Sequence, residues 1–314
     1  MTSPVARALT VTVRAAAHGP HTACACPPAV LADRRDGTVV RHGDTVAKAH
    51  ASDTDRGGLA VRLAVAAHPG LAGVLLPPLD LPAAELDGRP VTFWPHGTPV
   101  DPEHPEAAPW EAAAVLLARL HATPLDALPG PLPAMRGPHK AALALSRMRG
   151  ARPPLTVADP VERAWAALPA WARAEAPMPG GPALCHGDLH LGQVVRHPAD
   201  GDWFLIDIDD LGLGDPAWDL ARPAAWYAAG LLGREEWLRF IGAYQSAQGP
   251  AVPADDPWPA LDIPARALTV QSAALAVAKS TAEQRPLDEA ELVVLDACDR
   301  IAALPAELPA ERPK

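Results

Sequence analysis

The sequence predicts an α+β protein of two lobes, with a small antiparallel-sheet lobe followed by a larger helical lobe. The chain has 314 residues, enough for two domains of about 100–200 residues each. Short apolar runs between turn residues fill roughly the first hundred positions, and longer runs with helical spacing follow. Between them, residues 95–109 contain five prolines and little periodicity. We therefore expect a strand-rich lobe at 1–95, a connector at 96–109 and a helical lobe at 110–314.

Alternating apolar residues and turn signals define the first lobe. A hairpin is expected around His42-Gly43-Asp44 because glycine beside polar residues favours tight turns. Strand alternation in 45–50 puts Lys48 and His50 on one face, with Ala47 and Ala49 on the other. The expected strands are 29–33, 38–41, 45–50, 73–76 and 91–94, and one helix is expected at 59–67.

Helical periodicity dominates the second lobe, interrupted by one compact block at 184–219. Inside this block, two apolar runs flank a Pro-Ala-Asp-Gly turn at 198–201, which predicts a hairpin. The expected helices are 110–121, 160–176, 217–229, 234–248, 263–284 and 287–303.

Composition excludes several classes of protein. A net charge of −10 argues against a strongly basic nucleic-acid binder. No stretch reaches the roughly 20 apolar residues of a membrane span, and no basic-then-apolar leader opens the chain. We therefore expect a cytoplasmic protein. Its four cysteines are too scattered for a disulfide framework, and no neighbouring ligand pair in the sequence makes Cys24 and Cys26 a zinc site, so free thiols are expected.

Charge is divided unevenly between the two lobes. Residues 1–100 carry 9 basic and 8 acidic side chains, net +1, whereas the remaining residues carry 18 and 29, net −11. A negative field over the second lobe favours a cationic small molecule. The alternative is an acidic surface that is merely solvated.

The block at 184–219 carries the residues that point to chemistry. Its hairpin would bring Gln193, just before the first strand, close to Asp207, just after the second. Asp188 lies five residues before Gln193, on a loop opened by Gly187. Such oxygen ligands suit Mg²⁺ whose shell is completed by phosphate. Phosphoryl transfer also needs a lysine for the phosphates, and Lys48 is the one lysine of the first lobe among four in the chain.

These residues resemble the signature of the aminoglycoside phosphotransferase and choline kinase-like family of small-molecule kinases. The matching residues are His186-Gly187-Asp188, Gln193 after four intervening residues, Ile206-Asp207-Ile208-Asp209, and Gly214-Asp215-Pro216-Ala217-Trp218-Asp219-Leu220-Ala221. The resemblance implies a bilobal protein-kinase-like fold with a catalytic hairpin. It also implies transfer of the γ-phosphate of ATP, with Mg²⁺, to a hydroxyl of a small molecule such as an aminoglycoside or another amino sugar. Antibiotic resistance would follow from an aminoglycoside acceptor.

The resemblance also assigns roles. It makes Asp188 the catalytic base, Lys48 the lysine that contacts phosphate, and Gln193 and Asp207 the metal ligands. His186 and Asp219 would brace the catalytic loop, and Asp209 would touch substrate or a water molecule near the metal. Besides these, Gly37 is the single glycine of the expected phosphate-covering loop, and Trp94, near the connector, is a candidate for the adenine pocket.

Two departures from the family pattern keep alternatives open. Gln193 stands where the family usually has asparagine, and the usual helical glutamate partner of the lysine is not visible, since the first glutamate is Glu85. A pseudokinase-like protein that binds nucleotide or metabolite without turnover is therefore one alternative, and a sugar kinase with a neutral acceptor is another. A hydrolase with zinc on His186, Asp188 and His190 is a third. The acceptor, the choice between ATP and GTP, and the oligomeric state are left open.

Overall fold

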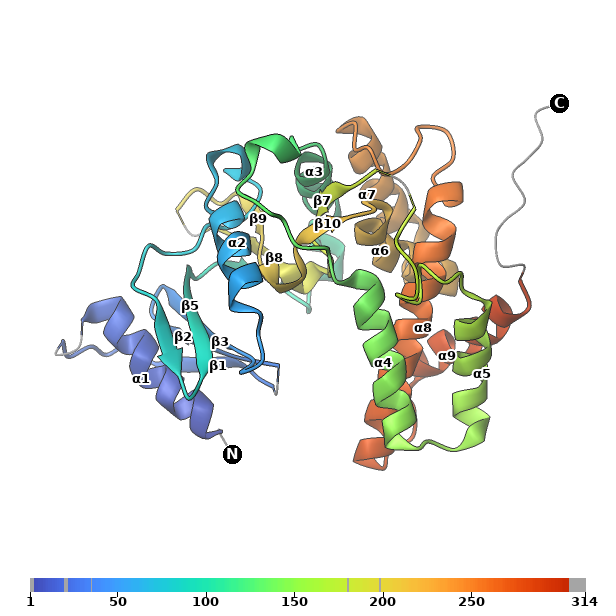
Figure 1. Ribbon diagram of the computed structural model, residues 1–314, viewed down its shortest axis with the longest axis horizontal. Coiled ribbons are helices and arrows are strands. Elements are labelled where there is room, and N and C mark those ends of the chain that lie inside the picture. The colour runs from blue at the N-terminus through green and yellow to red at the C-terminus, as the bar shows by residue number, and fades with distance from the viewer. Residues whose placement is uncertain (1–2, 20–21, 35, 180, 198, 305–314) are drawn as a thin grey trace. The chain divides into compact units, whose positions relative to one another are not determined.

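The computed structural model describes residues 3–19, 22–34, 36–179, 181–197 and 199–304 (Figure 1). The chain forms two compact units. The sheet unit comprises Met1–Ala108, Asp126–Pro133 and Gly192–Asp209; the helical unit comprises Pro109–Leu125, Ala134–Leu191 and Asp210–Lys314. Within the described residues, no helix is both long and apolar enough to cross a membrane.

A five-stranded antiparallel sheet forms the centre of the sheet unit, as expected. Its strand order is β1-β2-β3-β5-β4. The β2–β3 hairpin closes with His42 opposite Thr45, and Gly43 in its turn has a positive φ of 57°, which glycine adopts without strain. The strands are β1 Pro28–Asp33, β2 Gly37–His42, β3 Thr45–His50, β4 Ala84–Leu86 and β5 Arg89–Pro95, and helix α2, Arg56–Ala66, follows β3.

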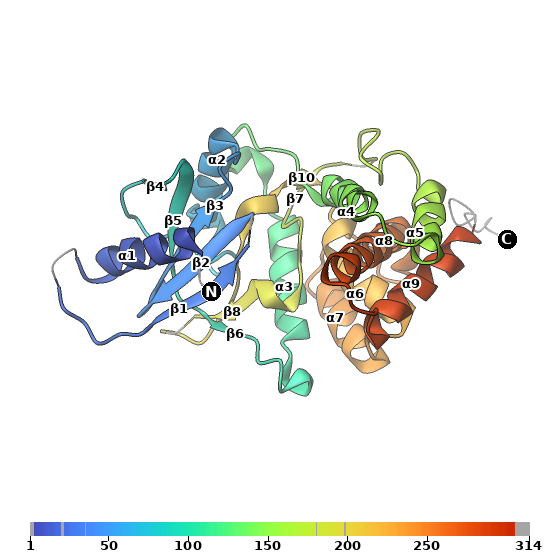
Figure 2. The ribbon, with the colours of Figure 1, turned by 90° about the horizontal axis from the view of Figure 1, so that it is seen from below.

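A helix that the sequence analysis did not predict, α1 (Pro4–His18), packs against β2 and β3 (Figure 2). Leu9 and Val13 of α1 join Ala47, Ala49 and other sheet residues in one buried cluster. The run of valine and threonine in this segment favours strands by propensity. Ser3 as N-cap, proline in the first turn and Gly19 as C-cap nevertheless mark a helix, and burial of one apolar face against the sheet stabilises it.

The predicted hairpin is present, as β8 (Val194–Arg196) and β9 (Trp203–Leu205). Val194 pairs with Leu205, and β6 (Thr98–Pro99) adds a third strand beside β8. Pro198 of the predicted turn lies outside the described residues. The expected strand at 73–76 is wrong: it is a turn followed by a single bridge between Leu75 and Leu205. Its short apolar run is buried beside the hairpin and contributes no strand to the main sheet.

Helix α8 lies at the centre of the helical unit and packs against α4, α6 and α9, an arrangement visible in Figure 2. Helix α4 was not predicted. The predicted helix at 160–176 is wrong in its bounds, because α5 begins five residues earlier and ends at Ala167. Pro169 disfavours helical geometry in Leu168, which stops the helix there. The helices are α3 Trp110–His121, α4 Gly137–Ala151, α5 Leu155–Ala167, α6 Ala217–Ala229, α7 Arg234–Ser246, α8 Trp258–Glu283 and α9 Glu289–Ala302.

A two-stranded sheet in the helical unit supports the loop that carries Asp188. Strand β7 (Ala183–Cys185) leads directly into this loop and pairs with β10 (Gly212–Gly214). The segment before α4 is tied to the same place, because the Met135 amide donates to the Leu213 carbonyl. The first turn of α4 is thereby fixed beside β10.

Candidate active site

The end of the hairpin brings Gln193 and Asp207 together, as the sequence predicts. The amide nitrogen of Gln193 donates to Oδ2 of Asp207 over 3.0 Å. Asp207 has a positive φ of 64°, which non-glycine residues rarely adopt and which is often found at functional sites. The Ile206 amide donates to the Gln193 carbonyl and so fixes the two segments side by side.

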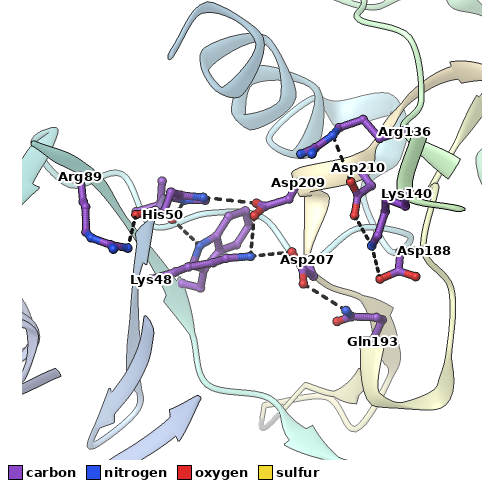
Figure 3. A network of polar contacts seen from close by, with 12 residues as sticks. Lys48, His50, Arg89, Arg136, Lys140, Asp188, Gln193, Asp207, Asp209 and Asp210 are labelled. Carbon is purple, nitrogen blue, oxygen red and sulfur yellow. Dashed lines mark hydrogen bonds and ion pairs between the residues drawn. The ribbon is translucent and has the colours of Figure 1, made fainter. Parts of the chain in front are cut away.

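Lys48 on β3 reaches the same hairpin end (Figure 3). Its Nζ lies 2.6 Å from Oδ1 of Asp207 and 2.9 Å from Oδ2 of Asp209. Burial alone would lower the pKa of Lys48, but the two carboxylates outweigh it and raise the pKa above its ordinary value. Lys48 is therefore a fixed ammonium ion.

Asp209 connects Lys48 to a line of polar contacts across the sheet. Its Oδ1 lies 3.3 Å from Nδ1 of His50, and Nε2 of His50 lies 2.9 Å from Oγ1 of Thr92. The indole N–H of Trp94 donates to the same Thr92 oxygen over 3.0 Å. Because the Trp94 indole already donates to the Thr92 oxygen, the Thr92 hydroxyl can donate to Nε2 of His50, and Nδ1 of His50 then faces Asp209. Burial raises the pKa of Asp209, but His50 and Lys48 together bring it below its ordinary value.

Asp209 is a carboxylate partner of Lys48, for which the sequence showed no helical glutamate. Helix α2, which follows β3, contains no acidic residue. Glu85 instead pairs with Arg56 on the surface, over 2.7 Å. Within the described residues, the carboxylates that pair with Lys48 therefore come from the segment after β9.

The two residues expected near the nucleotide lie on neighbouring parts of the sheet. Gly37 is the first residue of β2, and a Cβ there would lie 3.6 Å from Cε of Lys48. Trp94 lies in β5 opposite Val46. Both are therefore on strands that flank β3, which carries Lys48.

Gln193 and Asp207 fit a magnesium ion by the chemistry of their donors. Asp207 offers a carboxylate, and rotation of the Gln193 side-chain amide would turn its carbonyl oxygen toward the same point. Both are the hard oxygen ligands that Mg²⁺ takes, usually with phosphate and water completing its shell. Nζ of Lys48 lies 2.6 Å from the same Asp207 carboxylate, so a metal ion there would share that carboxylate with Lys48.

The helical unit holds Asp188 on a tightly fixed loop. The loop turns at Gly187, which has a φ of +84°, and a Cβ there would collide with the backbone carbonyl of Asp210. The Asp219 carboxylate accepts from the backbone amides of His186 and Gly187, over 2.5 Å and 2.7 Å. His121 lies 3.0 Å from Asp219. The residues that support the loop, His121, His186, Gly187 and Asp219, are all buried.

Two cations lie against the Asp188 carboxylate. Nζ of Lys140, on α4, lies 2.6 Å from Oδ2, and the guanidinium of Arg222, on α6, lies 2.7 Å from Oδ1. Lys140 also contacts Asp210 over 2.8 Å. Burial raises the pKa of Asp188, but Lys140 and Arg222 outweigh it and bring the pKa below its ordinary value. Asp188 is therefore ionised at neutral pH.

Sequence reasoning missed four residues of these groups: His50, Lys140, Asp210 and Arg222. Lys140 carried a signal, because it is one of only four lysines, but its helix was not predicted. The alternative zinc hydrolase finds no support, because His186, Asp188 and His190 are not among the converging ligand groups of the described residues.

Comparison with known proteins agrees with this architecture. A family profile described as the phosphotransferase enzyme family matches residues 59–263. No curated protein gives a significant match. Among solved structures, a thermostable mutant of aminoglycoside phosphotransferase APH(4)-Ia matches with a TM-score of 0.61 and 16% identity, over 88% of this chain and 94% of that one.

Two further solved structures have the same fold. A choline/ethanolamine kinase family protein from Mesorhizobium loti matches with a TM-score of 0.54 and 18% identity, over 90% of this chain and 89% of that one. The GDP complex of wild-type aminoglycoside 2'-phosphotransferase-IIIa matches with a TM-score of 0.55 and 16% identity, over 96% and 99%. At these identities the likeness shows the fold.

The kinase-like fold, with its five-stranded sheet and mostly helical second part, defines a phosphotransferase that acts on small molecules. The family match covers well over half of the chain. The chain belongs to the phosphotransferase enzyme family.

Proposed function

We propose that the protein transfers the γ-phosphoryl group of ATP to a hydroxyl group of a small acceptor, with Asp188 as the base. The observation that carries this proposal is the Asp188 carboxylate, kept ionised by Lys140 and Arg222 at the end of a loop braced by Asp219. An ionised, positioned carboxylate can accept the acceptor's hydroxyl proton as the oxygen attacks phosphorus.

The sheet unit is proposed to bind the nucleotide. Lys48 contacts the phosphates, and Asp209 and His50 hold its ammonium group in position. Gln193 and Asp207 hold Mg²⁺, which when bound neutralises charge on the phosphate oxygens. Gly37 lets the phosphates approach Lys48, and Trp94 contacts the adenine. In support, a related aminoglycoside phosphotransferase forms a ternary complex with AMP-PNP and hygromycin B, and another binds GDP.

The charges around Asp188 favour a neutral acceptor such as a sugar. An amino group next to the reacting hydroxyl would be repelled by Lys140 and Arg222, each within 2.7 Å of the carboxylate.

An aminoglycoside or another amino sugar is the second candidate. The net charge of −11 over residues 101–314 favours a cation at longer range. Antibiotic resistance follows only from this second candidate. We further propose a cytoplasmic location, where ATP is available.

The test is ATP consumption over matched pairs of acceptors, each pair a neutral sugar and its amino-sugar analogue, with the product identified by mass spectrometry. We expect phosphorylated neutral sugars, and no product with Asp188→Asn. The exposed Asp126 provides the control variant Asp126→Asn, which should keep wild-type turnover. Product from the amino sugars alone would select the second candidate. Nucleotide binding without any product over the whole panel would contradict the transfer proposal.

A further inference from the structure

The sheet unit contains a second cluster of chemically active side chains, separate from Lys48 and its partners. His18 is the last residue of α1, Cys24 and Cys26 follow in the next loop, and His42 is the last residue of β2. One ligand atom from each of the four lies within 4.8 Å of all the others. The sequence hides this grouping because β2 contributes the fourth member from far along the chain.

We propose that His18, Cys24, Cys26 and His42 form a structural zinc site. Two thiolates and two imidazoles are a common ligand set for tetrahedral zinc, and a full set of four protein ligands characterises structural rather than catalytic sites. Magnesium and calcium are unsuited to this set because they prefer oxygen ligands. Two thiolates also neutralise the charge of the ion.

The geometry is close to what zinc requires. Bond lengths of about 2.3 Å to sulfur and 2.0–2.1 Å to nitrogen give ligand–ligand distances of about 3.3–3.8 Å in a tetrahedron. Sγ of Cys24 lies 3.0 Å from Nε2 of His42. Sγ of Cys26 and Nε2 of His18 converge over the hairpin turn, where each lies 3.8 Å from the position that a Cβ of Gly43 would take. Adjustments of about an ångström would complete the tetrahedron.

A buried ring nitrogen gives a second, independent reason. Nε2 of His18 is buried and has no hydrogen-bond partner among the described residues. His42 as a whole is only 3% exposed, and the two rings meet edge to face with centroids 5.2 Å apart. A buried polar atom without a partner costs free energy. A zinc ion on Nε2 of His18 would remove that cost.

The site would fasten α1 to the sheet. His18 ends the helix, His42 ends β2 at the β2–β3 hairpin, and the cysteines lie on the loop between α1 and β1. Leu9 and Val13 of the same helix cover the face of the sheet opposite Lys48. Zinc would therefore stabilise the layer beneath β3 and take no part in phosphoryl transfer.

The first experiment measures the metal directly. The full-length protein, purified without a histidine tag, is analysed for zinc and then loaded with Co²⁺ after removal of bound metal. We expect about one zinc ion per chain, and with cobalt the intense visible bands of a tetrahedral ion together with a thiolate-to-cobalt charge-transfer band. A six-coordinate cobalt spectrum, or a disulfide between Cys24 and Cys26 in the protein purified under reducing conditions, would overturn the proposal.

The second experiment uses variants and does not depend on catalysis. Cys24→Ser and Cys26→Ser should each weaken zinc binding more than about 100-fold. Losing a residue that only hydrogen-bonds to a metal ligand already lowers metal affinity about 10- to 100-fold. Cys298→Ala is the matched control, because this buried thiol lies on α9 in the helical unit, and it should bind zinc like wild type. Zinc should raise Tm in wild type and in the control but not in Cys24→Ser. Equal zinc affinity in all of these proteins would refute the site, and the wild-type cobalt spectrum decides the matter if a variant does not fold.

Discussion

Nζ of Lys140 lies 2.6 Å from Oδ2 of Asp188, so the proposed base is ion-paired (Figure 3). Arg222 holds the other oxygen. An acceptor hydroxyl must therefore share Asp188 with one of these cations. The pair also sets the protonation state of the base, which makes Lys140 testable through the pH dependence of turnover.

Replacing Lys140 should move the acidic limb of the pH–rate profile. Lys140 and Arg222 bring the pKa of Asp188 below its ordinary value, against the effect of burial. Without Lys140 the pKa rises, so Asp188 is protonated at a higher pH. We expect the acidic limb of kcat/KM to shift to higher pH in Lys140→Gln. Lys279→Gln, at an exposed position of α8, is the control, and an unshifted limb in Lys140→Gln would count against the pairing.

Asp188→Asn should abolish most of the turnover and leave nucleotide binding within a few-fold of wild type. General-base help is worth about 10²–10⁴ in rate, whereas the phosphates are proposed to contact Lys48 in the other unit. Steady-state kcat and nucleotide titration by calorimetry measure the two effects separately. A variant that keeps more than about a tenth of wild-type kcat would remove Asp188 from the role of base.

Lys48→Ala should raise the nucleotide KM by about ten- to a hundred-fold, the size of a lost charge-assisted contact. Lys48→Arg should not restore it, because a planar guanidinium does not match the compact ammonium that lies between Asp207 and Asp209. Initial rates against ATP concentration give KM and kcat. Unchanged values in Lys48→Ala would show that the nucleotide binds elsewhere.

Asp209→Asn should weaken the response of stability to acid. Burial raises the pKa of Asp209, but His50 and Lys48 outweigh it and bring the pKa below its ordinary value. A group whose pKa falls on folding stabilises the protein above its unfolded pKa, and that stabilisation is lost as pH falls through the folded value. We expect wild type to lose more stability than Asp209→Asn between about pH 5 and pH 2. Urea titrations at several pH values measure this, with exposed Asp202→Asn as control; parallel curves for wild type and Asp209→Asn would contradict it.

Gln193→Ala should raise the Mg²⁺ concentration needed for half-maximal rate, because it removes one proposed oxygen ligand. Gln193→Asn should be partly tolerated, since its carbonyl is one methylene short of a loop shaped around glutamine. Titration of Mg²⁺ against initial rate separates the variants, and Gln245→Ala, on α7, should behave as wild type. If Gln193 merely capped the hairpin, Ala and Asn would cost similar stability and leave the Mg²⁺ requirement unchanged.

The sequence predicted the parts of the fold that local patterns determine. The β2–β3 hairpin, the hairpin that brings Gln193 to Asp207, and helices such as α3 and α6 follow from turn residues and periodicity. Helix α1 was not predicted because its valines and threonines favour strands. Packing of its apolar face against the sheet stabilises the helix instead.

The partners of the site residues could not be predicted in the same way. The pairing of Lys48 with Asp209 joins residues 161 positions apart (209 − 48), and nothing local to either one signals it. Lys140 reaches Asp188 only because α4 begins next to β10. Such contacts depend on the tertiary arrangement, and no short stretch of the sequence signals them.

The ion-paired lysines have a practical consequence for chemical labelling. Acylating reagents attack the neutral amine, and the carboxylates around Lys48 and Lys140 raise the pKa of both against the effect of burial. Of the four lysines in the chain, Lys279 is exposed on α8. An amine-reactive dye or surface-coupling reagent used near neutral pH should therefore modify Lys279 well before Lys48 or Lys140. Coupling through Lys279 should therefore leave Lys48 and Lys140 unmodified.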